Sequence, residues 1–244
     1  MKYYKLIVTI VLLIAAFTIA TAQDKVNRQS LIWARYYLKL KLNDKYTIRY
    51  EIEERLFFKN QRQHQFMTRA FADRYLGKGW NTAIGIAYFS HSRPSDPTVL
   101  EYRNWSEIRP VLEIGKRHIL SDKFKIDHRF WQEFRFYEQE NKSISYRNLR
   151  TRYRLEFRFQ LNTQLTLRLL DEIHFNPEEN DGRTFFDQNR IGIGAQYFPK
   201  PHLGFELAYI NWFQQISKLP EFYQRDIMRI TIFLDIRTGK RAVN

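Results

Sequence analysis

The sequence predicts an all-β protein, a transmembrane antiparallel up-and-down β-barrel that follows a cleaved signal peptide. Three observations indicate this fold class. Apolar and charged residues alternate through segments long enough to cross a bilayer, the chain begins with an export signal, and no second long apolar run remains for a membrane helix. We therefore expect two parts, a signal peptide over residues 1–22 and a barrel over residues 23–244.

The clearest alternation lies in residues 148–161. Its odd positions, from Leu149 to Leu161, are mostly apolar, and its even positions are polar or charged. A period of two is that of a β-strand, whose successive side chains point to opposite faces. A membrane strand needs roughly 9 to 11 residues, so this segment is long enough to span a bilayer.

Residues 1–22 have the three parts of a secretory signal peptide. Lys2 and Lys5 precede an apolar run over residues 6–20, and Ala20-Thr21-Ala22 provides the small residues of a cleavage site. The alternative is a membrane anchor, but the apolar run is shorter than the roughly 17 to 25 residues of a spanning helix. We expect the mature chain to begin at Gln23.

Composition limits the partners and the chemistry. The chain has 244 residues, no cysteine and a formal net charge of +14, which becomes +12 when Lys2 and Lys5 are removed (14 − 2). Without cysteine there are no disulfides, thiolate nucleophiles or cysteine metal ligands. This charge would indicate nucleic acid in a cytosolic protein, but export argues against that partner. We expect outer-membrane lipids, including lipopolysaccharide, and small anionic solutes or another envelope protein.

Strand-like segments recur along the chain after the signal peptide. Asn43-Asp44-Lys45 and Asn162-Thr163-Gln164 separate neighbouring segments, because Asn and Asp tolerate turn dihedrals. Gly77-Lys78-Gly79 makes a further turn. The expected strands are 31–42, 46–57, 66–76, 80–90, 105–114, 124–136, 148–161, 165–175, 190–197, 203–213 and 226–237.

Short turns and long polar connections alternate between these segments with few exceptions, and aromatic residues such as Trp80 and Tyr153 lie near strand ends. This arrangement is typical of an outer-membrane barrel, whose closure pairs every backbone group within the hydrocarbon. Bacterial single-chain barrels have even strand numbers. We therefore expect twelve strands, with a short extra strand near residues 26–30, and ten strands as the alternative.

The charged face of the strands is expected to line the lumen. One interpretation is a salt-bridged network that fills a narrow barrel, because buried charges need partners and arginine pairs well with carboxylates. The other is a narrow anion-preferring pore, or a site for an anionic lipid or solute. The predicted lumen-lining residues are Arg49, Glu51, Glu53, Arg55, Arg109, Arg129, Glu133, Arg135, Arg150, Arg152, Arg154, Glu156, Arg158, Arg168, Glu172 and Arg190.

A membrane-embedded hydrolase is the alternative function. Its acid and histidine side chains must share one face of a strand, which requires spacing of i and i+2. Glu172 with His174 has this spacing, as does Glu51 with Glu53, and both pairs are expected near strand ends. His91 lies between two serines and fails, because adjacent residues point to opposite faces.

We expect no metal site and no cofactor. The six histidines are scattered along the chain without the spacing of known ligand sets. A glycine-rich phosphate-binding loop is not found either.

A set of short motifs extends over essentially the whole mature chain. They are Trp33 with Leu38-Lys39-Leu40, residues 50–55 (Tyr-Glu-Ile-Glu-Glu-Arg), Arg109-Pro110, residues 128–136 (His-Arg-Phe-Trp-Gln-Glu-Phe-Arg-Phe), Arg154-Leu155, Asp171-Glu172 and residues 186–190 (Phe-Asp-Gln-Asn-Arg). Together with the signal peptide they resemble the outer-membrane family filed as domain of unknown function 2490 (DUF2490). The resemblance implies a barrel in the outer membrane of a Gram-negative bacterium and no established activity. The chain departs from outer-membrane proteins in general after Phe233, where a tail continues to Asn244.

Overall fold

The computed structural model describes residues 25–178, 184–216 and 221–238, which form a closed β-barrel. The expected signal peptide at residues 1–22 and the last residues of the C-terminal tail lie outside the described residues. Within the described ranges, no helix is both long and apolar enough to cross a membrane.

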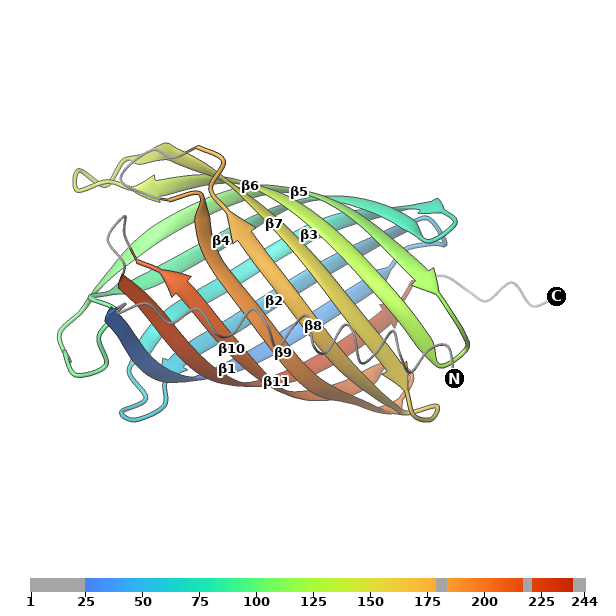
Figure 1. Ribbon diagram of the computed structural model, residues 1–244. Coiled ribbons are helices and arrows are strands. Elements are labelled where there is room, and N and C mark those ends of the chain that lie inside the picture. The colour runs from blue at the N-terminus through green and yellow to red at the C-terminus, as the bar shows by residue number, and fades with distance from the viewer. Residues whose placement is uncertain (1–24, 179–183, 217–220, 239–244) are drawn as a thin grey trace.

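Eleven strands build the barrel in the described part of the chain (Figure 1). Each expected segment overlaps one of them, and strands that follow each other in sequence pair antiparallel. The strands are β1 (Lys25–Lys41), β2 (Tyr46–Phe57), β3 (Gln63–Gly77), β4 (Trp80–Arg93), β5 (Arg103–Ile119), β6 (Phe124–Glu138), β7 (Ile144–Gln160), β8 (Leu165–Phe175), β9 (Phe186–Lys200), β10 (Leu203–Gln215) and β11 (Glu221–Arg237).

The barrel closes through a parallel seam between β1 and β11. The two strands stay in register from the Lys25 and Glu221 pair to the Lys41 and Arg237 pair. The expectations of twelve and of ten strands are therefore wrong for the described chain. Residues 26–30 belong to the first half of β1 and form no separate strand. The even-number rule follows from all-antiparallel closure, whereas a parallel seam also pairs the backbone groups of both edges.

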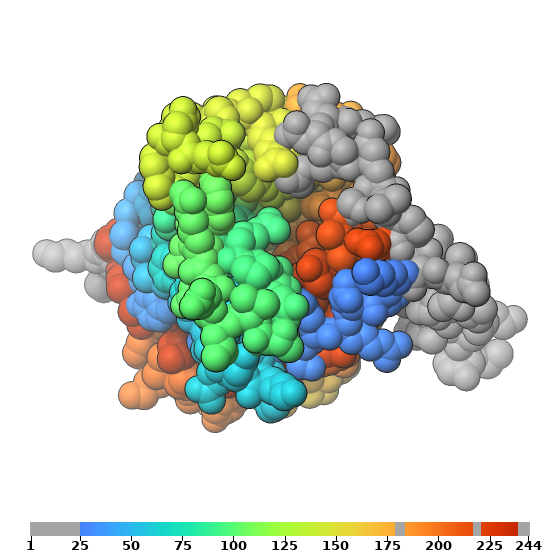
Figure 2. All heavy atoms as spheres, turned by 90° about the vertical axis from the view of Figure 1, so that its left-hand side faces the viewer, coloured from blue at the N-terminus to red at the C-terminus, as the bar shows by residue number. Residues whose placement is uncertain are grey.

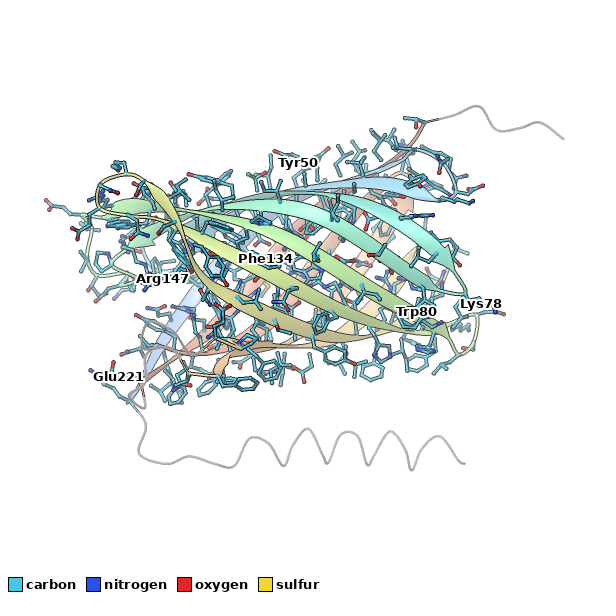
Figure 3. All side chains as sticks on the ribbon, turned by 90° about the horizontal axis from the view of Figure 1, so that it is seen from above. Tyr50, Lys78, Trp80, Phe134, Arg147 and Glu221 are labelled. Atoms are coloured by element: carbon cyan, nitrogen blue, oxygen red, sulfur yellow. The ribbon has the colours of Figure 1, made fainter. Side chains whose placement is uncertain are left out.

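The two ends of the barrel differ in their connections. One end, called here the turn end, carries short turns such as 42–45, 78–79 and 161–164. The other, the loop end, carries longer connections such as 94–102. Figure 3 places Lys78 and Trp80 at the turn end, opposite Arg147 and Glu221 at the loop end. As a consequence of the odd strand number, β1 begins at the loop end and β11 finishes at the turn end (Figure 1).

Local chemistry explains the turns. The side-chain oxygen of Asn43 accepts hydrogen bonds of 2.9 Å from the backbone amides of Lys45 and Tyr46. Asn162 accepts the corresponding pair of bonds in the turn between β7 and β8. Gly79 has a φ of +81°, and a Cβ there would collide with the carbonyl oxygen of Arg117. Only glycine fits this position without strain.

Alternate side chains face outward and inward on the strands. Exposed apolar side chains cover the outside, among them Ile84 at 66%, Ile193 at 58% and Leu207 at 56% exposure. On β7, Arg150 and Arg152 are buried inside the barrel. The facing predicted from the alternation in residues 148–161 agrees with this burial. The outer surface is of the kind that hydrocarbon covers in membrane barrels.

Apolar side chains also lie inside the barrel. Phe71, Ala83, Val111 and Trp131 form one buried cluster. The Phe71 ring occupies the space above Gly85, where a Cβ would overlap it. A second cluster lies on the opposite wall and consists of Leu31, Trp33, Phe57, Ile210, Trp212 and Ile227. The interior therefore combines charged and aromatic layers.

Candidate functional site in the barrel lumen

Arginines that share carboxylates form the wall of the lumen. Arg150 and Arg152 of β7 both donate to Glu133 of β6, at 2.6 and 2.9 Å. Glu133 lies directly across from Arg150 in the β6 and β7 register, so the strand pairing itself brings the charges together. One carboxylate thus serves two guanidiniums, and the wall carries a positive excess. Charge-assisted bonds of this kind are the strong ones in proteins.

The same sharing occurs throughout the lumen. Glu107 accepts 2.6 Å bonds from Arg109 and Arg135, and Glu156 accepts from Arg158 at 3.2 Å and from Arg168 at 2.8 Å. In each case one arginine lies two residues along the same strand as the carboxylate, and the other comes from the neighbouring strand. The interpretation of a salt-bridged interior therefore describes much of the lumen.

A cavity of about 640 Å³ occupies the loop half of the lumen. Most of its lining side chains come from the part of each strand nearer the loop end, and Arg35, Arg129 and Arg154 lie just past the strand midpoints toward the turn end. Of the predicted lumen-lining residues, those that line this cavity are Glu53, Arg55, Arg109, Arg129, Arg135, Arg150, Arg152, Arg154, Glu172 and Arg190. The others, which face inward without lining it, are Arg49, Glu51, Glu133, Glu156, Arg158 and Arg168.

Trp131 lies beneath arginines of the cavity and is called its floor here. Three arginines that line the cavity stack on its ring, with guanidinium carbons 3.9 Å (Arg129), 4.4 Å (Arg152) and 4.9 Å (Arg69) from the centroid. Trp131 is 1% exposed and packs on Phe71 with ring centroids 5.1 Å apart. Trp131 does not itself line the cavity, so the arginines stacked on it lie between the ring and the open space.

The connection 94–102 crosses part of the mouth. Its Ser95 carbonyl accepts a 2.8 Å bond from Gln29 of β1, and its Ser95 hydroxyl accepts a 3.4 Å bond from Arg225 of β11. In Figure 2, which views this end, the green segment after β4 lies against the blue start of β1 and the red-orange part of β11. Hydrogen bonds from the Thr98 hydroxyl and amide lower the pKa of Asp96 in this connection. The loop narrows the entrance to the cavity.

The residues predicted for hydrolysis are held by other groups. His174 contacts Glu172 at 3.2 Å and Gln188 at 2.8 Å, and Glu172 is also bonded to Arg129 and Arg152. Among the described residues, the His174 ring bonds only Glu172 and Gln188, so both ring nitrogens are engaged in the lumen network.

Glu51 and Glu53 lie in the middle of β2, so the expectation that they sit near a strand end is wrong. Glu51 pairs with Arg69 at 2.7 Å and Glu53 with Arg55. The strand extends about as far as the alternation predicted, but the acidic pair falls at its centre, where the tilted strands bring arginines close.

Sequence reasoning missed several lumen groups. His91 of β4 lies 2.6 Å from Glu107 of β5 and 2.7 Å from Gln65 of β3. This contact joins neighbouring strands, so spacing along one strand could not find it. Arg225 and Arg229 of β11 were also missed, although both occupy inward-facing positions in the alternation of that strand.

A protein-family match covers most of the chain. The family described as "Protein of unknown function (DUF2490)" matches residues 31–221. The chain belongs to this family. The resemblance seen in the short motifs is thereby confirmed.

Among solved structures, the barrel is similar to one described as "NanC porin structure in rhombohedral crystal form". The TM-score is 0.53 at 9% sequence identity, and the match covers 83% of this chain and 96% of that one. At this identity the likeness concerns the fold alone, a porin-type barrel. A comparison with curated protein sequences finds no significant match.

Proposed function

We propose that this DUF2490 protein is an outer-membrane barrel of the pore type that admits small anionic solutes through its loop end and passes them across a narrow, arginine-lined lumen. The observation that carries the proposal is the cavity of about 640 Å³ whose walls hold more arginines than carboxylates. Fixed positive charge between low-dielectric walls attracts anions and repels cations.

The floor determines the rate of passage. Trp131 and the paired charges beneath it leave little free bore, so conductance is small and rises only when the floor side chains move. Narrow barrels are filled by their own side chains in this way. The arginines of the cavity wall select for anions, and the layer around Trp131 limits the flux.

The outer membrane is the proposed location. The exposed apolar band fits a bilayer, and the closed barrel leaves no unpaired strand edge for hydrocarbon to meet. Residues 1–22 are proposed to direct export and to be removed. Lipids of the outer membrane, including lipopolysaccharide, are then the surrounding partners, and an envelope protein at the exposed loops is a further one.

A planar-bilayer experiment tests the function. We expect the refolded protein to give small currents whose reversal potential in a salt gradient shows preference for anions. Trp131→Ala removes the floor ring and increases conductance, while Trp80→Ala, on the outside at the turn end, leaves conductance unchanged. Phe71→Ala is a second floor variant in case Trp131→Ala does not refold. Cation preference, or silence of the wild type and both floor variants, refutes the pore.

A further inference from the structure

One lumen arginine stands apart from the shared ion pairs. Arg190 of β9 lines the cavity, and no described carboxylate lies within salt-bridge distance of it. Its cross-strand neighbour on β8 is Glu172, whose oxygens are taken by Arg129 and Arg152. The Nε of Arg190 is buried without a partner, and its terminal nitrogens bond to no described residue. A half-buried guanidinium with free donors needs an acceptor from elsewhere.

Two tryptophans hold this guanidinium in place. Its central carbon lies 4.5 Å from the Trp212 centroid and 5.6 Å from the Trp33 centroid. The two indoles meet edge to face, 6.0 Å apart at 70°. Cation–π contacts orient a guanidinium without consuming its N–H groups, which remain available for a ligand.

The surroundings of Arg190 are rich in donors and poor in acceptors. Arg225 stacks on Trp212 from the neighbouring strand at 4.3 Å and also lacks a carboxylate partner among the described residues. Trp33 Nε1 and His64 Nδ1 are buried without partners nearby, and the His64 ring lies 6.1 Å from Trp212. An anionic ligand supplies what this wall of the cavity lacks.

We infer that Arg190, between Trp33 and Trp212, is a binding site for the carboxylate group of a small organic anion. The free terminal edge of a guanidinium is a planar fork that matches a carboxylate in two parallel bonds. Tyr223, which lines the same cavity beside Arg225, offers aromatic surface for the organic part of the ligand. The cavity volume falls within the range of small-molecule sites.

Inorganic phosphate fits this site less well. A strongly hydrated dianion needs several converging donors, and Arg225 already donates to Gln29, Gln214 and Ser95. Of the two arginines stacked on Trp212, only Arg190 has no hydrogen-bond partner among the described residues, so a single charged donor group remains for the dianion. The site therefore favours a carboxylate attached to an apolar or ring-shaped body over a compact inorganic anion. This inference rests on the proposed function, because it names the class of anion that the lumen takes.

Calorimetric titration of the refolded full chain in detergent tests the site with benzoate as the probe. Arg190→Gln is expected to weaken benzoate binding at least about tenfold, the loss typical of a charged bidentate pair. Arg154→Gln is the matched control, because it removes one positive charge from another strand lining the same cavity. It should weaken binding much less. Arg190→Lys, which keeps the charge and loses the fork, should fall between wild type and Arg190→Gln.

The results of these titrations and of the current measurements distinguish the Arg190 binding site from the anion-conducting pore. Equal weakening by Arg190→Gln and Arg154→Gln means a diffuse field and overturns the site, as does phosphate binding as tight as benzoate. Anion-selective current together with benzoate binding that ignores Arg190 retains the pore and removes the site. Benzoate binding that depends on Arg190 in a barrel without current retains the site and removes the pore. Heat-modifiable gel migration checks that each variant has refolded.

Discussion

The loop half and the turn half of the lumen contain the same kinds of side chain, yet the cavity of about 640 Å³ lies mainly in the loop half. In the turn half, Glu156 gathers Arg158 and Arg168 into the space between the strands. In the loop half, Arg190 and Arg225 lie back against Trp212 and leave the centre open. The guanidiniums around Glu156 are thus held by ion pairs, whereas those beside Trp212 are held against the cavity wall by an aromatic ring.

The largest expected effect distinguishes the two halves by stability. Glu156→Gln should lower the free energy of unfolding by about 3–5 kcal/mol, because it removes the carboxylate that pairs with Arg154 and Arg158 and one of the two that pair with Arg168. Glu53→Gln should cost less, since Arg55 keeps its contacts with Gln65 and Trp33 beside the cavity. Urea unfolding in lipid vesicles measures both. Equal losses of unfolding free energy in Glu156→Gln and Glu53→Gln would mean that the loop half and the turn half do not differ in solvation.

A second prediction concerns the outer and inner faces of β7. Leu155→Arg should impair assembly in the membrane by about 2–4 kcal/mol if the residue lies near the midplane, because Leu155 is on the outer face of β7. Arg154→Gln, one residue away and facing the cavity, should assemble normally and change only the lumen. Folding yield into vesicles, read from gel migration, compares the two. Normal assembly of Leu155→Arg would reverse the assigned faces.

Packing in the turn half gives a smaller effect. Gly85→Ala should destabilise the barrel by about 1–3 kcal/mol, because the new Cβ overlaps the Phe71 ring. Adding Phe71→Ala removes the overlap with the ring and leaves the 2.8 Å approach to the Ala70 carbonyl oxygen, so the double variant should lose less than the sum of the single variants. Urea unfolding of the wild type, the two single variants and the double variant gives the four free energies of this double-mutant cycle. Strict additivity would show that the Phe71 ring does not occupy this space.

The smallest expected effect lies at the mouth. The lowered pKa of Asp96 means that its bonds with Thr98 stabilise the connection 94–102 above the ordinary pKa of an aspartate and are lost as pH falls through the lowered value. The NMR shift of the Thr98 amide should titrate at a pH below that of aspartate in an unstructured peptide. Asp96→Asn should abolish this titration. A midpoint at or above the ordinary value would contradict the bonding.

Much of the barrel could be predicted from local pattern. Alternation identified every strand, and the turn residues Asn43 and Asn162 marked connections that their side-chain bonds confirm. The strand number could not be predicted in this way. Residues 26–30 continue β1, and closure depends on whether its edge meets β11 in parallel, which no local signal reports.

The candidate site shows the same division. Period-two patterning places Arg150, Arg190 and Glu172 on one face, because a strand leaves no choice about the side to which each residue points. Which of them are paired is decided across strands. Glu172 lies opposite Arg190 in the register but bonds Arg129 and Arg152, and this leaves Arg190 to the tryptophans.

By itself, then, the sequence determined the all-β class, the strands, their inner and outer faces and the positive excess of the lumen, since these follow from the order of residues along each strand. Only the tertiary structure decided the parallel seam, the cavity above Trp131 and the unpaired state of Arg190. Each of these depends on strand stagger and on which long side chains reach one another across the barrel, and such distances are set by closure of the whole sheet.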